Sequence, residues 1–299
     1  MHVDPDRLSS RDAGMGHASD RTRTTEGREK AALVAACRRS VACDIVAMHS
    51  RIESFEFHPM EGGVIVSRLD RSLIAGLSPF QGVAPADLDR ILQRARSLRI
   101  TKDEAVFEQE GEAQSFFLLI AGHVRVVKTT PDGQQVIVRY ISPGELMGIA
   151  QALGRSTYPA SAIAAVDCVV LAWPGNLWSE FATAFPNFGA NTYKTVGTRL
   201  NDTHSRVVEM ATEQVEQRVA HALLRLVKQT GKTTDEGILI DFPISRQDIA
   251  EMTGTTLHTV SRLLTSWEDK GLVKSGRQKV TIVEPHRLFL LAQGRAEKS

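Results

Sequence analysis

The residues best suited to recognition chemistry lie together on one predicted helix near the C-terminus. Val260, Leu264 and Trp267 recur at helical spacing and would bury one face of this helix. The opposite face then carries Leu257, His258, Ser261 and Arg262. A short, exposed polar face of this kind is what a helix needs when it lies in the major groove of DNA and hydrogen-bonds with base edges.

The residues on either side predict a winged helix-turn-helix. Ser245 is a favourable N-cap for a first, short helix, and Gly254 suits the turn that lets the second helix leave at a steep angle. The second helix begins at Thr255 or Thr256. Residues 272–283 then predict two short strands joined at Ser275-Gly276. This wing carries cations that can reach phosphates, namely Lys274, Arg277 and Lys279. A packing unit of the same shape with no DNA role is the alternative, but cap, turn and basic wing coincide here.

A long helix is predicted before this unit. Pro186 suits a helix start, and no further proline occurs before residue 231. Alternating steps of three and four residues predict the seam of a two-stranded coiled coil, formed by Tyr193, Val196, Leu200, Thr203, Val207 and Met210. A seam without a partner in its own chain implies a homodimer. A helix packed only on its own β-domain is the alternative. Apolar positions over 215–226 predict a second helix that packs into the C-terminal domain.

The residue pattern from residue 99 to residue 174 is typical of a β-domain. Short runs rich in Val, Ile and Phe are separated by Gly111, Gly122, the turn 131–133 and Pro143-Gly144. This even spacing predicts a small β-barrel or jelly roll, preceded by one or two short helices from Leu69 onward. The fold class is therefore α+β, with a β-barrel sensor domain, a long dimerisation helix and a winged helix-turn-helix.

The chain of 299 residues is long enough for two modules and an extension. Residues 1–68 begin with a polar, charged stretch, so we expect a largely disordered N-terminal extension; Met48 and Met60 are candidate alternative starts. The expected division is 69–185 for the sensor domain, 186–212 for the dimerisation helix, 213–287 for the DNA-binding domain and 288–299 for a tail.

Net charge, hydropathy and the motifs that are missing from the sequence exclude several classes of protein. A net charge of +1 means that DNA contacts must come from a local group of cations. No run of about 18 apolar residues and no secretory signal is visible, so we expect a cytoplasmic protein without membrane contact. The chain lacks a phosphate-binding loop, an H-E-x-x-H and a G-x-S-x-G motif, so we expect no enzyme.

Three segments carry a family resemblance: AGHVRVVKTTPDGQQVIVRYISPGELMG, ATEQVEQRVAHALLRLVKQTG and SRQDIAEMTGTTLHTVSRLL. From about Leu69 to Leu291 the chain resembles the Crp/Fnr family, which are dimeric bacterial regulators with a cyclic-nucleotide-binding-like barrel. The resemblance implies a palindromic double-stranded DNA operator and contact with RNA polymerase. It does not say whether the target genes are activated or repressed.

The resemblance also assigns DNA contacts. His258, Ser261 and Arg262 match positions that read bases, and Arg262 could bridge O6 and N7 of guanine. Arg246 and Gln247 match positions that touch the DNA backbone, and we add to that group Thr256, Thr259, Lys274, Arg277 and Lys279. The family usually has glutamate where this chain has His258, so we expect a different half-site.

The expected signal is not cyclic AMP. Relatives that bind it use a glutamate and an arginine, whereas this chain has Ile149 at the first position and no arginine within 157–162. Arg155 is a nearby substitute. The expected effector pocket comprises Gly144, Glu145, Leu146, Gly148, Arg155, Thr203 and His204. A scaffold barrel on a constitutively DNA-competent regulator, or one controlled by redox state at Cys168, is the alternative; a cyclic-nucleotide-binding regulatory protein is the remote one.

The sequence does not identify a cofactor. Cys37, Cys43 and Cys168 cannot supply the four thiolates of an iron–sulfur cluster, and Gly148 and Ala150 stand where the carbon-monoxide-sensing branch has its haem ligands. The chain looks most like the nitrogen-oxide-responsive and rhizobial-type branches. Some members there use haem, for which His204, and then His123, are the candidate ligands; nitric oxide, redox state or oxygen limitation would be the signal.

Overall fold

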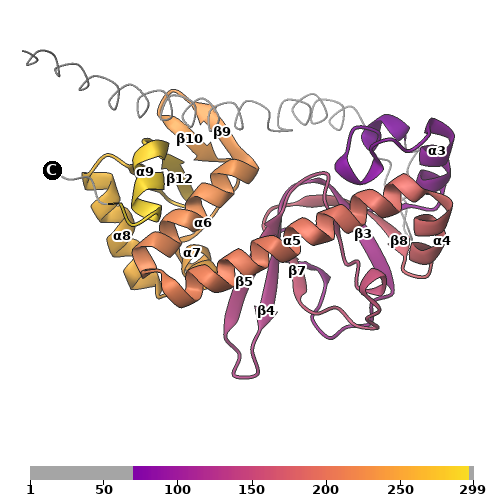
Figure 1. The fold of residues 1–299 in the computed structure, drawn as a ribbon, viewed down its shortest axis with the longest axis horizontal. Coiled ribbons are helices and arrows are strands. Elements are labelled where there is room, and N and C mark those ends of the chain that lie inside the picture. Colours follow the sequence, from indigo (N-terminus) through magenta and orange to yellow (C-terminus); the bar gives the residue numbers. More distant parts are fainter. Residues whose placement is uncertain (1–69, 296–299) are drawn as a thin grey trace, which may run out of the picture. The chain divides into compact units, whose positions relative to one another are not determined.

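A computed structural model describes residues 70–295 of the chain (Figure 1). The predicted disordered extension over residues 1–68, together with Cys37 and Cys43, lies outside these residues, as does the end of the predicted tail.

The N-terminal part is built from two four-stranded antiparallel sheets, with strand orders β1-β8-β3-β6 and β2-β7-β4-β5. The strands are β1 (Arg96–Ile100), β2 (Ala105–Phe107), β3 (Ser115–Ala121), β4 (Val124–Thr129), β5 (Gln135–Ile141), β6 (Leu146–Met147), β7 (Ser161–Ala164) and β8 (Cys168–Pro174). Apart from the β4–β5 hairpin, sequential strands alternate between the two sheets, as in a jelly roll. The predicted fold class is confirmed, and we call residues 96–174 the sensor barrel.

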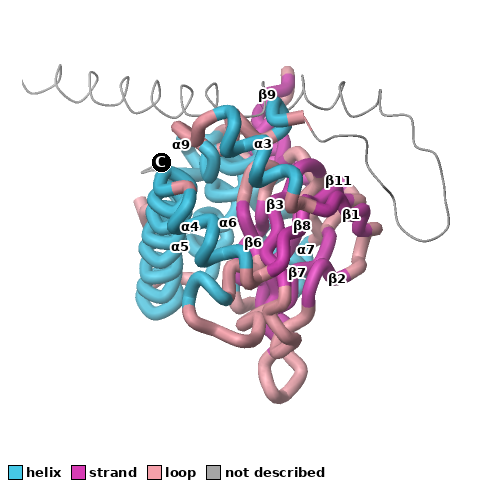
Figure 2. The backbone as a smooth tube through the Cα atoms, turned by 90° about the vertical axis from the view of Figure 1, so that its right-hand side faces the viewer, coloured by secondary structure: helices cyan, strands magenta, loops and turns pink. Residues whose placement is uncertain are grey.

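Strand β3 shows how the barrel is held between two apolar layers. Phe117 and Leu119 lie in the cluster inside the barrel, whereas Phe116, Leu118 and Ile120 lie in a second cluster with the helices. Side chains alternate along a strand, so a strand that is apolar at every position is buried on both faces. The helices therefore cover one sheet, and Figure 2 shows them on one side of the strands.

Short helices and the start of the long helix pack on that covered sheet. They are η1 (Arg71–Leu73), η2 (Ser78–Phe80), α3 (Pro85–Gln93), η3 (Gln151–Leu153), α4 (Leu177–Ala184) and α5 (Pro186–Thr212). Trp173 stacks on Phe116 at 5.4 Å between ring centroids and donates a hydrogen bond from Nε1 to the Ile91 carbonyl. Among residues 70–295, none of the helices combines the length and the apolar composition that a membrane span requires.

The C-terminal domain joins four helices to a four-stranded sheet of order β11-β12-β10-β9. Its elements are α6 (Val215–Thr230), β9 (Gly231–Thr234), β10 (Gly237–Ile240), α7 (Arg246–Thr253), α8 (Leu257–Asp269), β11 (Val273–Gly276), β12 (Lys279–Ile282) and α9 (Pro285–Ala292). The β9–β10 hairpin was not predicted. It extends the wing strands into a four-stranded sheet beside α6.

Candidate nucleic-acid interface

The two helices α7 and α8 begin at the predicted caps. The Ser245 hydroxyl accepts a hydrogen bond from the Asp248 amide, and the Asp248 carboxylate accepts one from the Ser245 amide, which forms a capping box. Gly254 follows α7 with φ +60°, a backbone conformation that glycine adopts without strain. The Thr256 hydroxyl caps α8 by accepting from the Thr259 amide at 3.2 Å. The local sequence thus fixes the angle between the helices.

Helix α8 is anchored by its apolar face. Val260, Leu264 and Trp267 are fully buried. The Trp267 Nε1 also donates a hydrogen bond to the Glu216 carboxylate on α6 at 3.0 Å. A buried indole with a satisfied N–H is a rigid anchor, so the opposite face of α8 is held in place.

That opposite face carries the predicted base-reading residues. His258 and Arg262 are exposed and Ser261 is half-buried, while Leu257 exposes 43% of its surface. Within residues 70–295 neither His258 nor Arg262 has a hydrogen bond or ion pair. Their polar groups are therefore available to another molecule.

The wing differs from the prediction in where it turns. Gly276 pairs with Lys279, so Arg277 and Gln278 form the turn, and Gln278 has φ +58°. The predicted turn at Ser275-Gly276 is wrong, because both residues belong to β11. As a result Arg277 stands at the wing tip, where it is exposed.

One of the residues predicted to contact phosphate, Lys274, forms an ion pair within the chain. The Lys274 ammonium lies 2.6 Å from the Glu236 carboxylate in the β9–β10 turn. Both side chains are more than half exposed, so such a pair contributes little to stability and a phosphate can compete for the lysine. Lys279 is exposed and has no partner in the described part of the chain.

A groove of about 390 Å³ separates the start of α7 from the wing. It is lined by residues that include Arg246, Gln247, Leu257 and Arg277. The Arg246 guanidinium donates to the Ser275 hydroxyl at 3.2 Å, which ties α7 to the wing. The groove joins predicted backbone contacts from α7 and the wing to the exposed face of α8.

The inside of the sensor barrel is occupied by aromatic side chains. Phe107 stacks on Tyr158 at 4.1 Å and on Phe117 at 5.7 Å between ring centroids. A Cβ added to Gly148 would stand only 3.0 Å from Phe117. Ile149 stands at the position where the resemblance places a glutamate in cyclic-AMP-binding relatives, and it is buried in the apolar cluster between the barrel and the helices.

The predicted effector residues do not form one site. Arg155 is exposed after η3, and Thr203 and His204 are exposed on α5. Leu146 is buried, and Gly144 lies against Leu77. Among these residues, Glu145 and Leu146 contact α5, through Arg199.

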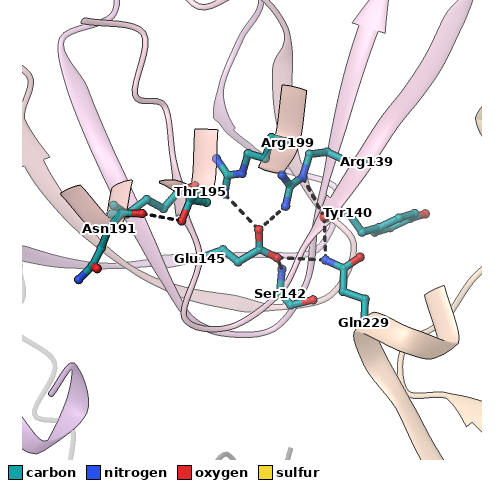
Figure 3. A network of polar contacts seen from close by, with 9 residues as sticks. Arg139, Tyr140, Ser142, Glu145, Asn191, Thr195, Arg199 and Gln229 are labelled. Atoms are coloured by element: carbon teal, nitrogen blue, oxygen red, sulfur yellow. Dashed lines mark hydrogen bonds and ion pairs between the residues drawn. The ribbon is translucent and has the colours of Figure 1, made fainter. Parts of the chain in front are cut away.

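Glu145 is the centre of a polar cluster that the sequence did not predict (Figure 3). Its carboxylate forms ion pairs with Arg139 and with Arg199, the latter at 3.1 Å, and accepts a hydrogen bond from Gln229 Nε2 at 3.0 Å. Gln229 also donates to the Tyr140 carbonyl. We call Arg139, Ser142, Glu145, Arg199 and Gln229 the Glu145 cluster. It joins the barrel to α5 and to α6 of the DNA-binding domain.

Further contacts hold the DNA-binding domain to strand β5. Arg206 on α5 donates to the Val138 carbonyl and, at 3.1 Å, to the Met252 carbonyl at the end of α7. Phe242, which precedes α7, stacks on His123 and packs against the tilted ring of Tyr140, with ring centroids 4.5 and 4.6 Å apart. Burial beside this ring lowers the pKa of His123 to about 4. The C-terminal domain, which we also call the reading head, thus packs against the sensor barrel of the same chain.

The two candidate haem ligands are not placed in a haem pocket. His204 is exposed on α5, and His123 is packed against Phe242. Within residues 70–295 no group of three or more His, Cys, Asp or Glu side chains could hold a metal ion. Burial raises the pKa of the Cys168 thiol to about 11, which favours the protonated thiol. In the single chain His204 therefore faces solvent, and the His123 ring is packed against Phe242.

The predicted seam of α5 is an exposed apolar face. Tyr193, Leu200, Val207 and Met210 expose between 49 and 63% of their surface, and Thr203 is exposed beside them. Val196 differs, because it packs partly against the barrel. Val208, which was not predicted, is 59% exposed. The face is unpaired in the single chain.

Comparison with known proteins agrees with this architecture. Residues 97–184 match the family described as "Cyclic nucleotide-binding domain", and residues 217–290 match "Crp-like helix-turn-helix domain". The chain is 29% identical over 217 residues to the "Cyclic AMP receptor protein" of Thermus thermophilus, which covers 73% of this chain and 97% of the relative.

Two rhizobial proteins are similar as well. The "Nitrogen fixation regulation protein FixK" of Bradyrhizobium diazoefficiens is 27% identical over 208 residues, covering 69% of this chain and 86% of that protein. The structure of FixK2 from Bradyrhizobium japonicum has the same fold, with a TM-score of 0.59 at 23% identity over 66% of this chain and 96% of that one. With a sensor barrel of the cyclic nucleotide-binding kind joined to a Crp-type reading head, the chain is a transcription regulator, not an enzyme, and belongs to the Crp/Fnr family.

Proposed function

We propose that the protein is a homodimer that binds an inverted-repeat DNA site through α8 and the wing, under the control of a signal received by the sensor barrel. The observation that carries this proposal is the exposed face of α8. His258 and Arg262 present unpaired donors there, next to a groove lined by Arg246 and Arg277. Base-edge contacts on α8 would specify sequence, and the surrounding cations would bind phosphates.

The dimer would form along α5. Its exposed residues Tyr193, Leu200 and Val207 offer a second copy the same apolar face. A two-fold axis along this helix repeats the contact on both subunits. The two α8 helices would then read half-sites about one helical turn apart, so the operator is an inverted repeat.

The half-site would differ from the common family sequence. Arg262 would pair with guanine through O6 and N7. An imidazole at His258 replaces a carboxylate, which would accept a hydrogen bond from the cytosine amino group. The preferred base at that position therefore changes.

The signal would not be cyclic AMP, because aromatic side chains occupy the barrel and Ile149 replaces an acidic residue. Signals of the nitric oxide, redox or oxygen-limitation kind fit the similarity to the rhizobial regulators better. The dimer would contact RNA polymerase in the cytoplasm and so change the transcription of its target genes.

A second candidate is a regulator that binds DNA at all times and keeps the barrel only as a scaffold. The stacked Phe107 and Tyr158 favour it, since aromatic side chains of the protein itself pack the inside of the barrel.

The test is selection of DNA sites from a random library with the full-length protein, purified without oxygen and recorded for a haem absorption band. Enrichment of one inverted repeat by the wild type, and its loss in Arg262→Ala but not in the control Arg155→Ala, supports the proposal. Equal binding with and without nitric oxide favours the constitutive candidate. Failure to enrich any sequence would contradict both.

A further inference from the structure

The Glu145 cluster carries an excess of positive charge. Arg139 and Arg199 face the single carboxylate of Glu145, and the other two members of the cluster, Ser142 and Gln229, are neutral. Burial, and then the neighbouring Arg139, lower the pKa of Arg199 to about 10. A second negative charge at this point would therefore be stabilised.

The neighbouring guanidinium of Arg206 adds a further positive charge. It donates to two backbone carbonyls, those of Val138 and Met252. Asp202 and Glu209 act on Arg206 electrostatically, and Glu209 is itself paired with Arg225 at 2.7 Å. The carboxylates of Asp202 and Glu209 on α5 therefore act on Arg206 and Arg225, and they do not neutralise the Glu145 cluster.

The cluster also has more donors than its carboxylate can use. One oxygen of Glu145 accepts from Arg139 and Arg199, and the other accepts from the Ser142 amide and from Gln229. Four donors fill the lone pairs of a carboxylate. Two further polar atoms of the cluster, Arg199 Nε and the Ser142 hydroxyl, are buried without a partner among the described residues.

This set matches a phosphate group better than a carboxylate. A phosphate monoester carries nearly two negative charges near neutral pH and offers three strong acceptor oxygens. Arginine is the residue suited to bind such oxygens through paired N–H groups. Two guanidinium groups would balance the charge, and the two unused donors would find acceptors.

The cluster is reachable from solvent. The side chains of Arg139, Glu145 and Arg199 keep 28, 25 and 21% of their exposure. These side chains are therefore partly in contact with solvent, and an anion can approach the guanidinium groups from there.

We propose that Arg139, Arg199 and Ser142 form a binding site for a phosphate-type dianion, and that Glu145 is an internal counter-ion which this ligand displaces. Loss of Glu145 removes one of the two hydrogen bonds that hold Gln229, and with it α6, to the barrel. Binding therefore loosens the docked DNA-binding domain. This regulatory consequence, but not the site itself, rests on the proposed DNA-binding function.

The site is tested by calorimetric titration of the full-length protein with inorganic phosphate and with phenyl phosphate at constant ionic strength. Glu145→Gln removes the competing anion and should raise phosphate affinity at least about tenfold, since a charge-assisted contact is worth about 1.5–3 kcal/mol, or roughly 10- to 150-fold. Arg199→Gln should lower it by a similar factor. Arg139→Gln, on the more exposed arginine, gives the same test if the first variant does not fold.

Arg277→Gln, on the wing, is the matched control and should leave the affinity unchanged. Tighter binding of phenyl phosphate than of inorganic phosphate identifies an organic phosphate as the ligand, and the reverse identifies the free ion. Phosphate binding that is lost in Arg277→Gln but kept in Arg199→Gln would overturn the proposal, because the anion would then occupy the DNA interface. So would an unchanged affinity in Glu145→Gln.

Hydrogen exchange of residues 135–141 and 246–253 reports the loosening. Phosphate should speed exchange in both segments of the wild type and in neither segment of Arg199→Gln. DNA binding is measured separately. Phosphate binding without any DNA binding would sink the proposed function and leave the site standing, whereas DNA binding without phosphate binding would do the opposite.

Discussion

The methyl group of Met210 lies where a side chain on Gly254 would stand. A Cβ built on Gly254 would be 2.5 Å from Met210 Cε. Met210 belongs to the exposed apolar face of α5, and Gly254 is the turn between α7 and α8. The end of the proposed dimer helix therefore touches the turn that sets the direction of the reading helix.

Gly254→Ala should destabilise the protein by about 1–3 kcal/mol, because a side chain is strained at φ +60° and also meets Met210. Adding Met210→Ala should recover the part of the loss that comes from the contact. Urea denaturation measures both. Gly276→Ala is the control, since its Cβ would meet only Lys279 Cβ at 4.0 Å; an equal loss there would contradict the prediction.

Arg262→Ala should weaken binding to the selected operator by about 1–3 kcal/mol and relax the preference at one base pair of each half-site. Arg277→Gln should instead weaken binding to all sequences alike and reduce its salt dependence, because it is expected to contact phosphate. Titration against operators with every single-base change, at two salt concentrations, separates the two roles. A uniform loss from Arg262→Ala would show that it does not read a base.

Leu200→Glu should convert the dimer to monomer, because it places a charge in the middle of the exposed apolar face of α5, where Leu200 itself is 54% exposed in the single chain. Sedimentation velocity measures the change. Thr198→Glu, at an exposed position of the same helix outside the predicted seam, should leave the dimer intact. If both variants dimerise like the wild type, α5 is not the interface.

The reading head could be predicted because its signals are local. Ser245, Gly254 and Thr256 each fix backbone conformation within a few residues, and the apolar period of α8 decides which face is buried. The sequence therefore placed His258 and Arg262 on an exposed face. The wing turn was missed because Ser275-Gly276 has the composition of a turn, whereas strand pairing puts the turn two residues later.

The Glu145 cluster could not be predicted in the same way. Glu145 meets Arg199 and Gln229, which are 54 and 84 residues away in the chain, and no periodic pattern marks such pairs. The contact of Phe242 with His123 likewise depends on how two domains dock. Both depend on tertiary packing, for which one sequence holds no local signal.

His123 should make the docked conformation sensitive to acid. Its pKa is lowered to about 4 from an ordinary value of 6.5, chiefly by burial, while Asp241 and Glu145 oppose the shift. Above pH 6.5 the imidazole is neutral in both the folded and the unfolded chain, so the stabilisation is fully present. Between pH 6.5 and 4 the unfolded chain binds a proton that the folded chain does not, so stability falls with pH, by at most about 3 kcal/mol over the whole window.

His123→Phe tests this, because a phenyl ring keeps the stacking on Phe242 and cannot titrate. The free energy of unfolding in urea, compared at pH 7.5 and pH 5, should fall less in the variant than in the wild type. The difference reports His123 alone, since all other titrating groups are shared. Parallel pH dependence in the two proteins would mean that the imidazole has the same pKa in the folded and the unfolded chain, as it has when it is exposed to water. The contact with Phe242 would then not hold the reading head in a pH-dependent way.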